Sequence, residues 1–259
     1  MSSISKELLD FQSLDQVIED MTRQLKELEE AGDYRAIFQR VYLLMTKEMK
    51  KRLTAGFFHD DVWMERVLVR FAQYYFDAIQ AHEQGEPYPL AWELAFRMAK
   101  QQKVFVLQDA LLGINAHINS DLPIVMYVIL SEDKVWPDAS MMLNRRQDHE
   151  KINDVLSDLV DLVQNELASH YARSIRIIDR FMGRKDESLS SFVLAHCRTN
   201  VWYNTELMLN AQDEEERILH QKRIENDAYV IGLQIAQSDS RFFRFLRRFA
   251  PFTRKRRWF

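Results

Sequence analysis

His117 and Asp121 are the side chains in this sequence best suited to chemistry, because they lie in an otherwise apolar stretch, VFVLQDALLGINAHINSDLP (residues 104–123). Their i, i+4 spacing places both on one side of a helix. Asn115 and Asn119 have the same spacing on roughly the opposite side. A buried polar group without a partner costs on the order of a few kcal/mol, so we expect other helices to supply partners or a metal ion.

A divalent metal ion is the cofactor that this pattern favours. Imidazole and carboxylate ligands suit zinc, iron, manganese or magnesium, and facing helices would complete the site. We expect His117 and Asp121 to bind the ion. The candidates for further metal ligands are His196 and Asp60, and those for catalytic residues are Asp148, His149, Asn115 and Asn119. A metal-activated water that attacks an ester or phosphoester is the simplest chemistry of such a site, and the amphipathic C-terminus would suit a lipid-like substrate.

The alternative is a binding protein without catalytic activity. An HxxxD spacing occurs by chance in many helices, and a buried His bonded to Asp is as common as a metal site. The polar side chains would then form a satisfied network beside a pocket for an apolar or amphipathic molecule.

The motif DDVWME (Asp60–Glu65) suggests a third possibility. Together with Asn153, Ser157 and Asp161, it looks like the aspartate-rich motif and the Asn/Ser/acid triad of class I terpenoid synthases. Those enzymes bind magnesium and a diphosphate, which Arg145 and Arg146 would meet here. On a helical wheel, however, the triad moves out of the apolar arc toward solvent, which argues against this alternative.

The composition predicts an all-α fold that positions these residues. Only six Gly and five Pro occur in 259 residues, and 47% of the residues are hydrophobic, as in a bundle of helices with short connections. We expect a single bundle around a buried central helix that ends or kinks at about Asp121, because Pro123 clashes with the carbonyl of Asn119. The helices expected from apolar spacing span residues 14–31, 34–53, 140–172 and 189–209. One more helix follows the capping Asp60 or Asp61, another begins at Leu90 and leads into the central one, and the last opens with QDEEER (residues 212–217) and runs to about Gln237. Arg70 and Asp77 fall on the outer face of the helix that follows Asp60 or Asp61, where we expect a surface ion pair.

The C-terminus differs from the rest of the chain. Residues 241–259 hold eight basic and no acidic residues, which leaves 27 basic against 39 acidic residues in the helical domain, residues 1–240. As a helix, this tail places Phe and Leu on one face and Arg on the other, a pattern typical of contact with a membrane surface. The acidic body argues against nucleic acid as a partner. The single Cys and the absence of an apolar leader or spanning segment favour the cytoplasm, with peripheral contact at the inner membrane surface.

The run GINAHINSDLP, with FHDDVWMERVLVRFAQYYFDA upstream and DHEKINDVL downstream, resembles an uncharacterised bacterial family known only as a domain of unknown function. The resemblance covers roughly residues 15–205 and implies no activity. The positions that fall on the family's pattern are Asp60, Tyr75, Asp77, Asn115, His117, Asn119, Asp121, Asp148 and Asn153.

Overall fold

The described part of the chain is helical. The computed structural model describes residues 13–102, 104, 106–132, 139–171 and 200–237, and contains no β-strand among them. The helices are α1 (Leu14–Glu30), α2 (Arg35–Thr54), α3 (Asp61–Gln84), α4 (Leu90–Gln101), α5 (Val106–Asn115), the π-helical turn η1 (Ala116–Asp121), α6 (Leu122–Glu132), α7 (Ala139–His170) and α10 (Glu214–Gln237). Residues 200–209 are also helical. The all-α fold predicted from composition is confirmed.

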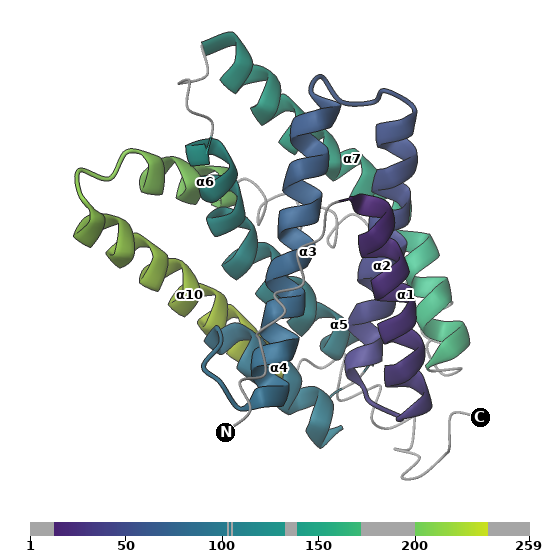
Figure 1. The fold of residues 1–259 in the computed structure, drawn as a ribbon. Coiled ribbons are helices and arrows are strands. Elements are labelled where there is room, and N and C mark those ends of the chain that lie inside the picture. Colours follow the sequence, from purple (N-terminus) through teal and green to yellow (C-terminus); the bar gives the residue numbers. More distant parts are fainter. Residues whose placement is uncertain (1–12, 103, 105, 133–138, 172–199, 238–259) are drawn as a thin grey trace, which may run out of the picture.

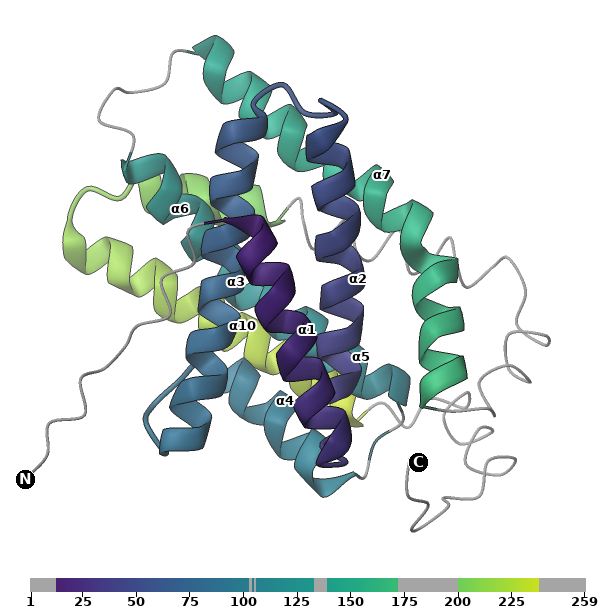
Figure 2. The same cartoon turned by 45° about the vertical axis from the view of Figure 1, so that its right-hand side comes forward.

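The central helix is the continuous segment α5–η1–α6. Helices α1, α2 and α3 lie side by side on one side of it, while α4 and α10 lie together on the other (Figures 1 and 2). The long helix α7 packs against α2 (Figure 2). No helix in the described ranges combines the length and the apolar composition needed to span a membrane.

Local signals in the sequence fix several helix ends. Ser13 caps α1 by accepting a hydrogen bond from the backbone of Gln16, and Asp60 caps α3 by accepting one from Trp63 at 2.9 Å. Gly85 ends α3 with a φ of 69°, a left-handed conformation that glycine adopts without strain.

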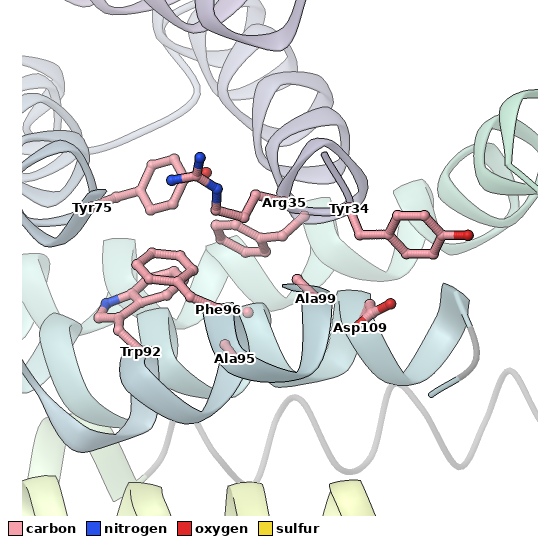
Figure 3. Close-up of a pocket in the computed structure, with 10 residues that line it drawn as sticks. Tyr34, Arg35, Tyr75, Trp92, Ala95, Phe96, Ala99 and Asp109 are labelled. Atoms are coloured by element: carbon pink, nitrogen blue, oxygen red, sulfur yellow. The ribbon is translucent and has the colours of Figure 1, made fainter. Parts of the chain in front are cut away.

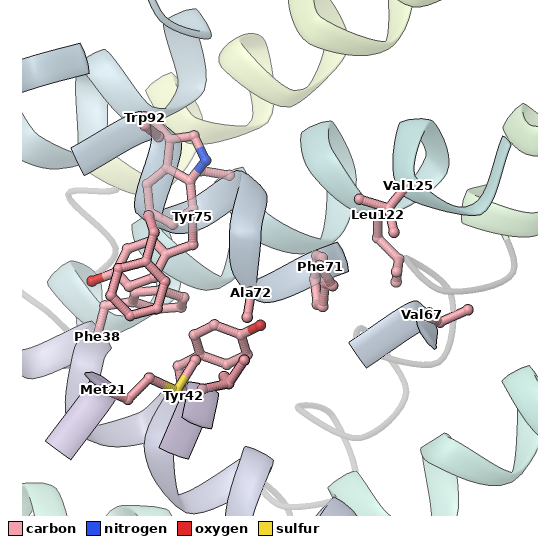
Figure 4. Close-up of a cluster of buried hydrophobic side chains, with 14 of the residues drawn as sticks. Met21, Phe38, Tyr42, Val67, Phe71, Ala72, Tyr75, Trp92, Leu122 and Val125 are labelled. Atoms are coloured by element: carbon pink, nitrogen blue, oxygen red, sulfur yellow. The ribbon is translucent and has the colours of Figure 1, made fainter. Parts of the chain in front are cut away.

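Aromatic side chains fill the space where α2, α3 and α4 approach the central helix. Tyr75 and Trp92 face one another beneath α2 (Figure 3). Phe38 and Tyr42 approach them from α2, and Phe71 lies one turn before Tyr75 on α3 (Figure 4). This aromatic cluster surrounds His117 of the central helix.

Of the end or kink expected near Asp121, the structure has an irregular turn, η1, after which the helix continues through Pro123 as α6. The ion pair predicted between Arg70 and Asp77 needs correction. On α3, Asp77 accepts a hydrogen bond from Gln73, whereas Arg70 pairs with Glu132 at 3.1 Å. The glutamate reaches Arg70 because α6 packs against α3, which the sequence of α3 alone does not reveal.

Two parts of the predicted architecture lie outside the described residues. They are His196, on the helix expected at 189–209, and the tail at 241–259. The division of the chain at residue 240 therefore stays a prediction.

Candidate functional site

The π-helical turn η1 forms where Pro123 disturbs the central helix. Proline has no N–H to donate, and its ring would clash with the carbonyl of Asn119 in a regular α-helix. The turn accommodates one extra residue, and the N–H of Leu122 bonds to the carbonyl of His117, five residues back. Such turns redirect side chains and are frequent at functional sites.

Asn115 and Asn119 form a satisfied hydrogen-bond network. The amide of Asn119 donates to Oδ1 of Asn115 at 2.9 Å, and the amide of Asn115 donates to the carbonyl of Ala228 at 2.8 Å. The pair therefore ties the start of η1 to α10.

His117 and Asp121 face the opposite side and are buried. Nδ1 of His117 lies 3.1 Å from Oδ2 of Asp121, and the indole N–H of Trp92 donates to the same oxygen at 2.8 Å. The carboxyl group thus holds the imidazole in one orientation through Nδ1 and leaves Nε2 available. The Nε2 atom is buried and has no hydrogen-bond partner among the described residues.

Aromatic rings from three helices enclose this imidazole. Phe71 stacks on it with a centroid distance of 3.4 Å and an interplanar angle of 5°, and Tyr42 meets it edge-on at 4.4 Å. Phe38 and Trp92 lie at 5.8 Å and Tyr75 at 6.0 Å. We call these five side chains the aromatic wall.

Burial controls the charge of the pair. It lowers the pKa of His117 and raises the pKa of Asp121, so both shifts favour the uncharged forms. When the carboxyl proton lies on Oδ2 and is donated to Nδ1, an uncharged pair carries its second proton on Nε2. In that arrangement the site presents an Nε2–H donor inside an apolar enclosure.

A small hollow adjoins the aromatic wall. Its volume is about 10 Å³, close to that of one water molecule, and its lining includes Phe38, Tyr75 and Trp92 (Figure 3). These three rings also contact His117, so they separate the hollow from the imidazole. The hydroxyl of Tyr75 is buried, and no described residue forms a hydrogen bond with it.

The hollow also has a carboxyl group in its lining. Asp109, in the first turn of α5, is 6% exposed, and neither of its carboxyl oxygens has a hydrogen-bond partner within the described part of the chain. Burial raises the pKa of Asp109 to about 8.

Gly113 allows the close approach of α5 to α2 at this hollow. A Cβ atom at position 113 would lie 2.4 Å from Cγ of Phe38. Only glycine therefore leaves room for Phe38 in its present place within the wall.

Asp60 and Asp148 lie at a different place in the fold. The carboxylate of Asp148 accepts hydrogen bonds from the backbone N–H groups of His59 and Asp60, at 2.8 and 2.9 Å. Asp60 begins α3, and Phe71, which stacks on His117, lies eleven residues further on, roughly 16 Å along the helix. These two carboxylates therefore join α7 to the start of α3.

The predicted completion of a metal site at His117 by Asp148 or Asp60 does not fit this geometry. Within the described ranges, no three His, Cys, Asp or Glu side chains gather closely enough to hold a metal ion. His149 is buried beside Trp202, with ring centroids 5.8 Å apart. His196 lies outside the described residues.

The diphosphate site suggested by the terpenoid-synthase pattern stays a prediction, and the described side chains give it little support. Ser157 and Asp161 are exposed on α7, and Arg146 pairs with Glu150 at 3.1 Å. Arg145 packs over the ring of Trp63, with 5.3 Å between its guanidinium carbon and the centroid, and its Nε lies 3.8 Å from Oδ2 of Asp60. The outward turn of the triad agrees with its position on the helical wheel.

Sequence reasoning missed Asp109 and four rings of the aromatic wall, whereas Tyr75 falls on the family's pattern. The rings fall on the inward stripes of their helices, where they are indistinguishable from ordinary core residues. One available signal was that the buried Asp121 requires a donor, which an indole supplies. Asp109 was itself visible as a lone carboxyl in the apolar run VLQDALL.

A comparison with protein-family models identifies the family to which the chain belongs. Residues 14–238 match a family of unknown function, DUF5995. The chain belongs to this family. The matched range contains α1 to α10, and with them every residue of the aromatic wall and the His117–Asp121 pair. No curated protein and no solved structure matches the chain of this DUF5995 member.

Proposed function

We propose that this protein binds a small, mostly apolar molecule at the His117–Asp121 pair. The observation that carries the proposal is the Nε2 atom of His117, which is buried inside the aromatic wall without a hydrogen-bond partner among the described residues. A buried donor left unpaired costs about 1–3 kcal/mol. A ligand with an acceptor oxygen, such as a ketone or an ether, would satisfy it.

The aromatic wall supports an apolar body for this ligand. Rings stacked and edge-on around one imidazole offer dispersion contacts and exclude water. Phe38 and Tyr75 line the hollow and also contact His117, so a ligand in the hollow would reach the imidazole after rotation of either ring. Binding of this kind is typical of pockets with few, well-placed polar groups.

The metal-dependent hydrolase expected from the sequence stays a prediction. Among the described residues, only His117 and Asp121 lie close enough together to bind one metal ion at this place. Asp121 already accepts a hydrogen bond from the indole N–H of Trp92. Elemental analysis of the purified protein tests this alternative directly. About one metal ion per chain would favour the hydrolase over the binding protein.

Matched probes test the binding proposal. Cyclohexanone and methylenecyclohexane have the same shape, but only the ketone carries an acceptor oxygen. We expect the ketone to bind about fivefold to tenfold more tightly by calorimetry, since one hydrogen bond contributes about 1 kcal/mol. Equal affinities, or no binding of either probe, would contradict the proposal.

Two variants at position 117 provide the control. His117→Phe fills the same space without a donor and should bind both probes equally. His117→Gln places an amide N–H near the position of Nε2 and should restore part of the preference for the ketone. Thermal unfolding of each variant shows whether it is folded. If neither variant folds, the comparison of the two probes on the wild-type protein still tests the proposal.

A further inference from the structure

Asp109 is a buried carboxyl group that no described residue satisfies. Its two oxygens are buried and lack hydrogen-bond partners there, although they border the hollow. Burying an unpaired carboxyl group is costly, and native proteins seldom retain one without a partner.

The surroundings of Asp109 favour a positively charged partner. Tyr34 and Phe96 line the same hollow from α2 and α4, with Trp92 one turn before Phe96 (Figure 3). Aromatic rings attract cations through their faces. The guanidinium of Arg35 also borders the hollow, but Asp33 and Glu83 hold it, at 2.8 and 3.1 Å.

The size of the hollow restricts which class of cation can bind beside Asp109. A hollow of about 10 Å³ takes a group the size of one water molecule, and an –NH₃⁺ group is about that size. It also offers three donors in a compact head, enough for both carboxyl oxygens. A guanidinium is wider and flat.

We propose that Asp109 binds the primary ammonium group of a small amine, whose apolar part lies against Phe96 and Trp92. This amine subsite deepens the proposed function by naming the class of ligand. It rests on the proposed function only in one respect, that the far end of the ligand lies toward His117. A second hollow, of about 170 Å³, also borders Tyr34, so a turn of that ring gives the amine more room.

Proton linkage gives the subsite a measurable signature. Because burial raises the pKa of Asp109 to about 8, the free carboxyl group is mostly protonated at neutral pH. An ammonium group binds the carboxylate and therefore releases that proton. Affinity for an amine should rise roughly fiftyfold from pH 6 to pH 8 and then level off.

The other groups that face Asp109 do not produce this profile. From α2 these are Tyr34, whose pKa is raised by burial and by Asp109, and Arg35, whose pKa is raised by its two carboxylates. On α3, burial raises the pKa of Tyr75. The α4 side of the hollow consists of Trp92, Ala95, Phe96 and Ala99, and the contact of α10 with the neighbouring Gln108 is the carbonyl of Ile235.

Calorimetry on the full chain with n-propylamine and its neutral analogue n-propanol tests the subsite. We expect the amine to bind at least tenfold more tightly at pH 8, with proton release visible as a dependence of the heat on the buffer. Asp109→Asn, nearly identical in shape, should abolish the preference, and Asp161→Asn, exposed on α7, should keep it. Equal binding of amine and alcohol, no proton release, or an unchanged preference in Asp109→Asn would overturn the proposal.

The outcome is separable from that of the ketone test. His117→Phe should lose the preference for a ketone but keep the preference for an amine. If the ketone binds as expected and the amine does not, only the Asp109 subsite is wrong. The buffer dependence of amine binding to the wild type tests the subsite even if Asp109→Asn fails to fold.

Discussion

At the scale of single residues, burial sets the chemistry of the site. His117, Asp121 and Asp109 are ordinary ionisable side chains, and burial shifts the pKa of each in the direction that favours its uncharged form. The difference between them is the partner. Nδ1 of His117 and Oδ2 of Asp121 share a hydrogen bond, whereas the Asp109 carboxyl group has no hydrogen-bond partner in the described ranges.

Asp121→Asn tests whether the pair is uncharged. In the wild type, Oδ2 of Asp121 bonds to both Trp92 and Nδ1 of His117. In the variant, an amide oxygen at this position can only accept from Trp92, and an amide nitrogen can only donate to Nδ1, so one of the two hydrogen bonds is lost. We expect the free energy of unfolding to fall by only about 1 kcal/mol, the value of one hydrogen bond, as measured in urea at pH 7. A loss of about 3–5 kcal/mol would instead indicate a broken charged pair.

Asp109→Asn should stabilise the protein in a manner that depends on pH. The pKa of Asp109 is about 8 in the folded state and near 4 in the unfolded chain. Between these values the unfolded chain holds fewer protons, so the wild type loses stability as the pH rises. The advantage of the variant should grow by about 1 kcal/mol per pH unit from pH 4 to 8. If the difference in free energy of unfolding between the variant and the wild type were the same at every pH, the raised pKa of Asp109 would be contradicted.

At the scale of elements, the π-helical turn and the close approach of α5 to α2 create the site. Pro123 and the apolar run before it made a disturbed, buried central helix predictable from the sequence. The form of the disturbance was not predictable, because a π turn and a helix end relieve the same proline clash. Which rings would face His117 depends on how α2, α3 and α4 pack, and helix periodicity does not contain that information.

Gly113→Ala should disrupt the wall from the side of α5. The added Cβ would overlap Phe38 at 2.4 Å, so the ring must move, at a cost of about 1–3 kcal/mol. Gly232→Ala on α10 is the matched control, because its Cβ would meet only the tip of Leu94, at 3.0 Å, and the amide of Asn115, at 3.3 Å. Thermal unfolding should show the larger loss at position 113. If the loss of thermal stability at position 113 were equal to or smaller than the loss at position 232, Phe38 would not be held in a fixed position.

At the scale of the whole molecule, the family match and the described helices cover the same range. Residues 14–238 contain the bundle and its site, while the basic and aromatic segment 241–259 lies beyond them. Composition and helix spacing predicted the bundle, because these depend on local pattern. Long-range juxtapositions, such as Asp148 with the start of α3, decided which polar residues share a site.

Removal of residues 241–259 tests the role predicted for the tail. We expect the truncated protein to keep its thermal midpoint and its binding of cyclohexanone, since the described helices end at Gln237. Binding to vesicles rich in anionic lipid, measured by co-sedimentation, should fall at least tenfold. Unchanged sedimentation would refute a membrane role for the tail.

The protonation state of His117 is the most direct test of the whole account. Long-range proton–nitrogen NMR distinguishes the two ring nitrogens, and His117→Gln identifies the signal among the seven histidines. We predict an imidazole protonated on Nε2 from pH 5 to 8, with Nδ1 accepting the proton of Asp121, and a shift of the Nε2 signal when cyclohexanone is added. A doubly protonated ring at pH 6, or an Nε2 without a proton at neutral pH, would contradict the uncharged donor on which the proposed binding site depends.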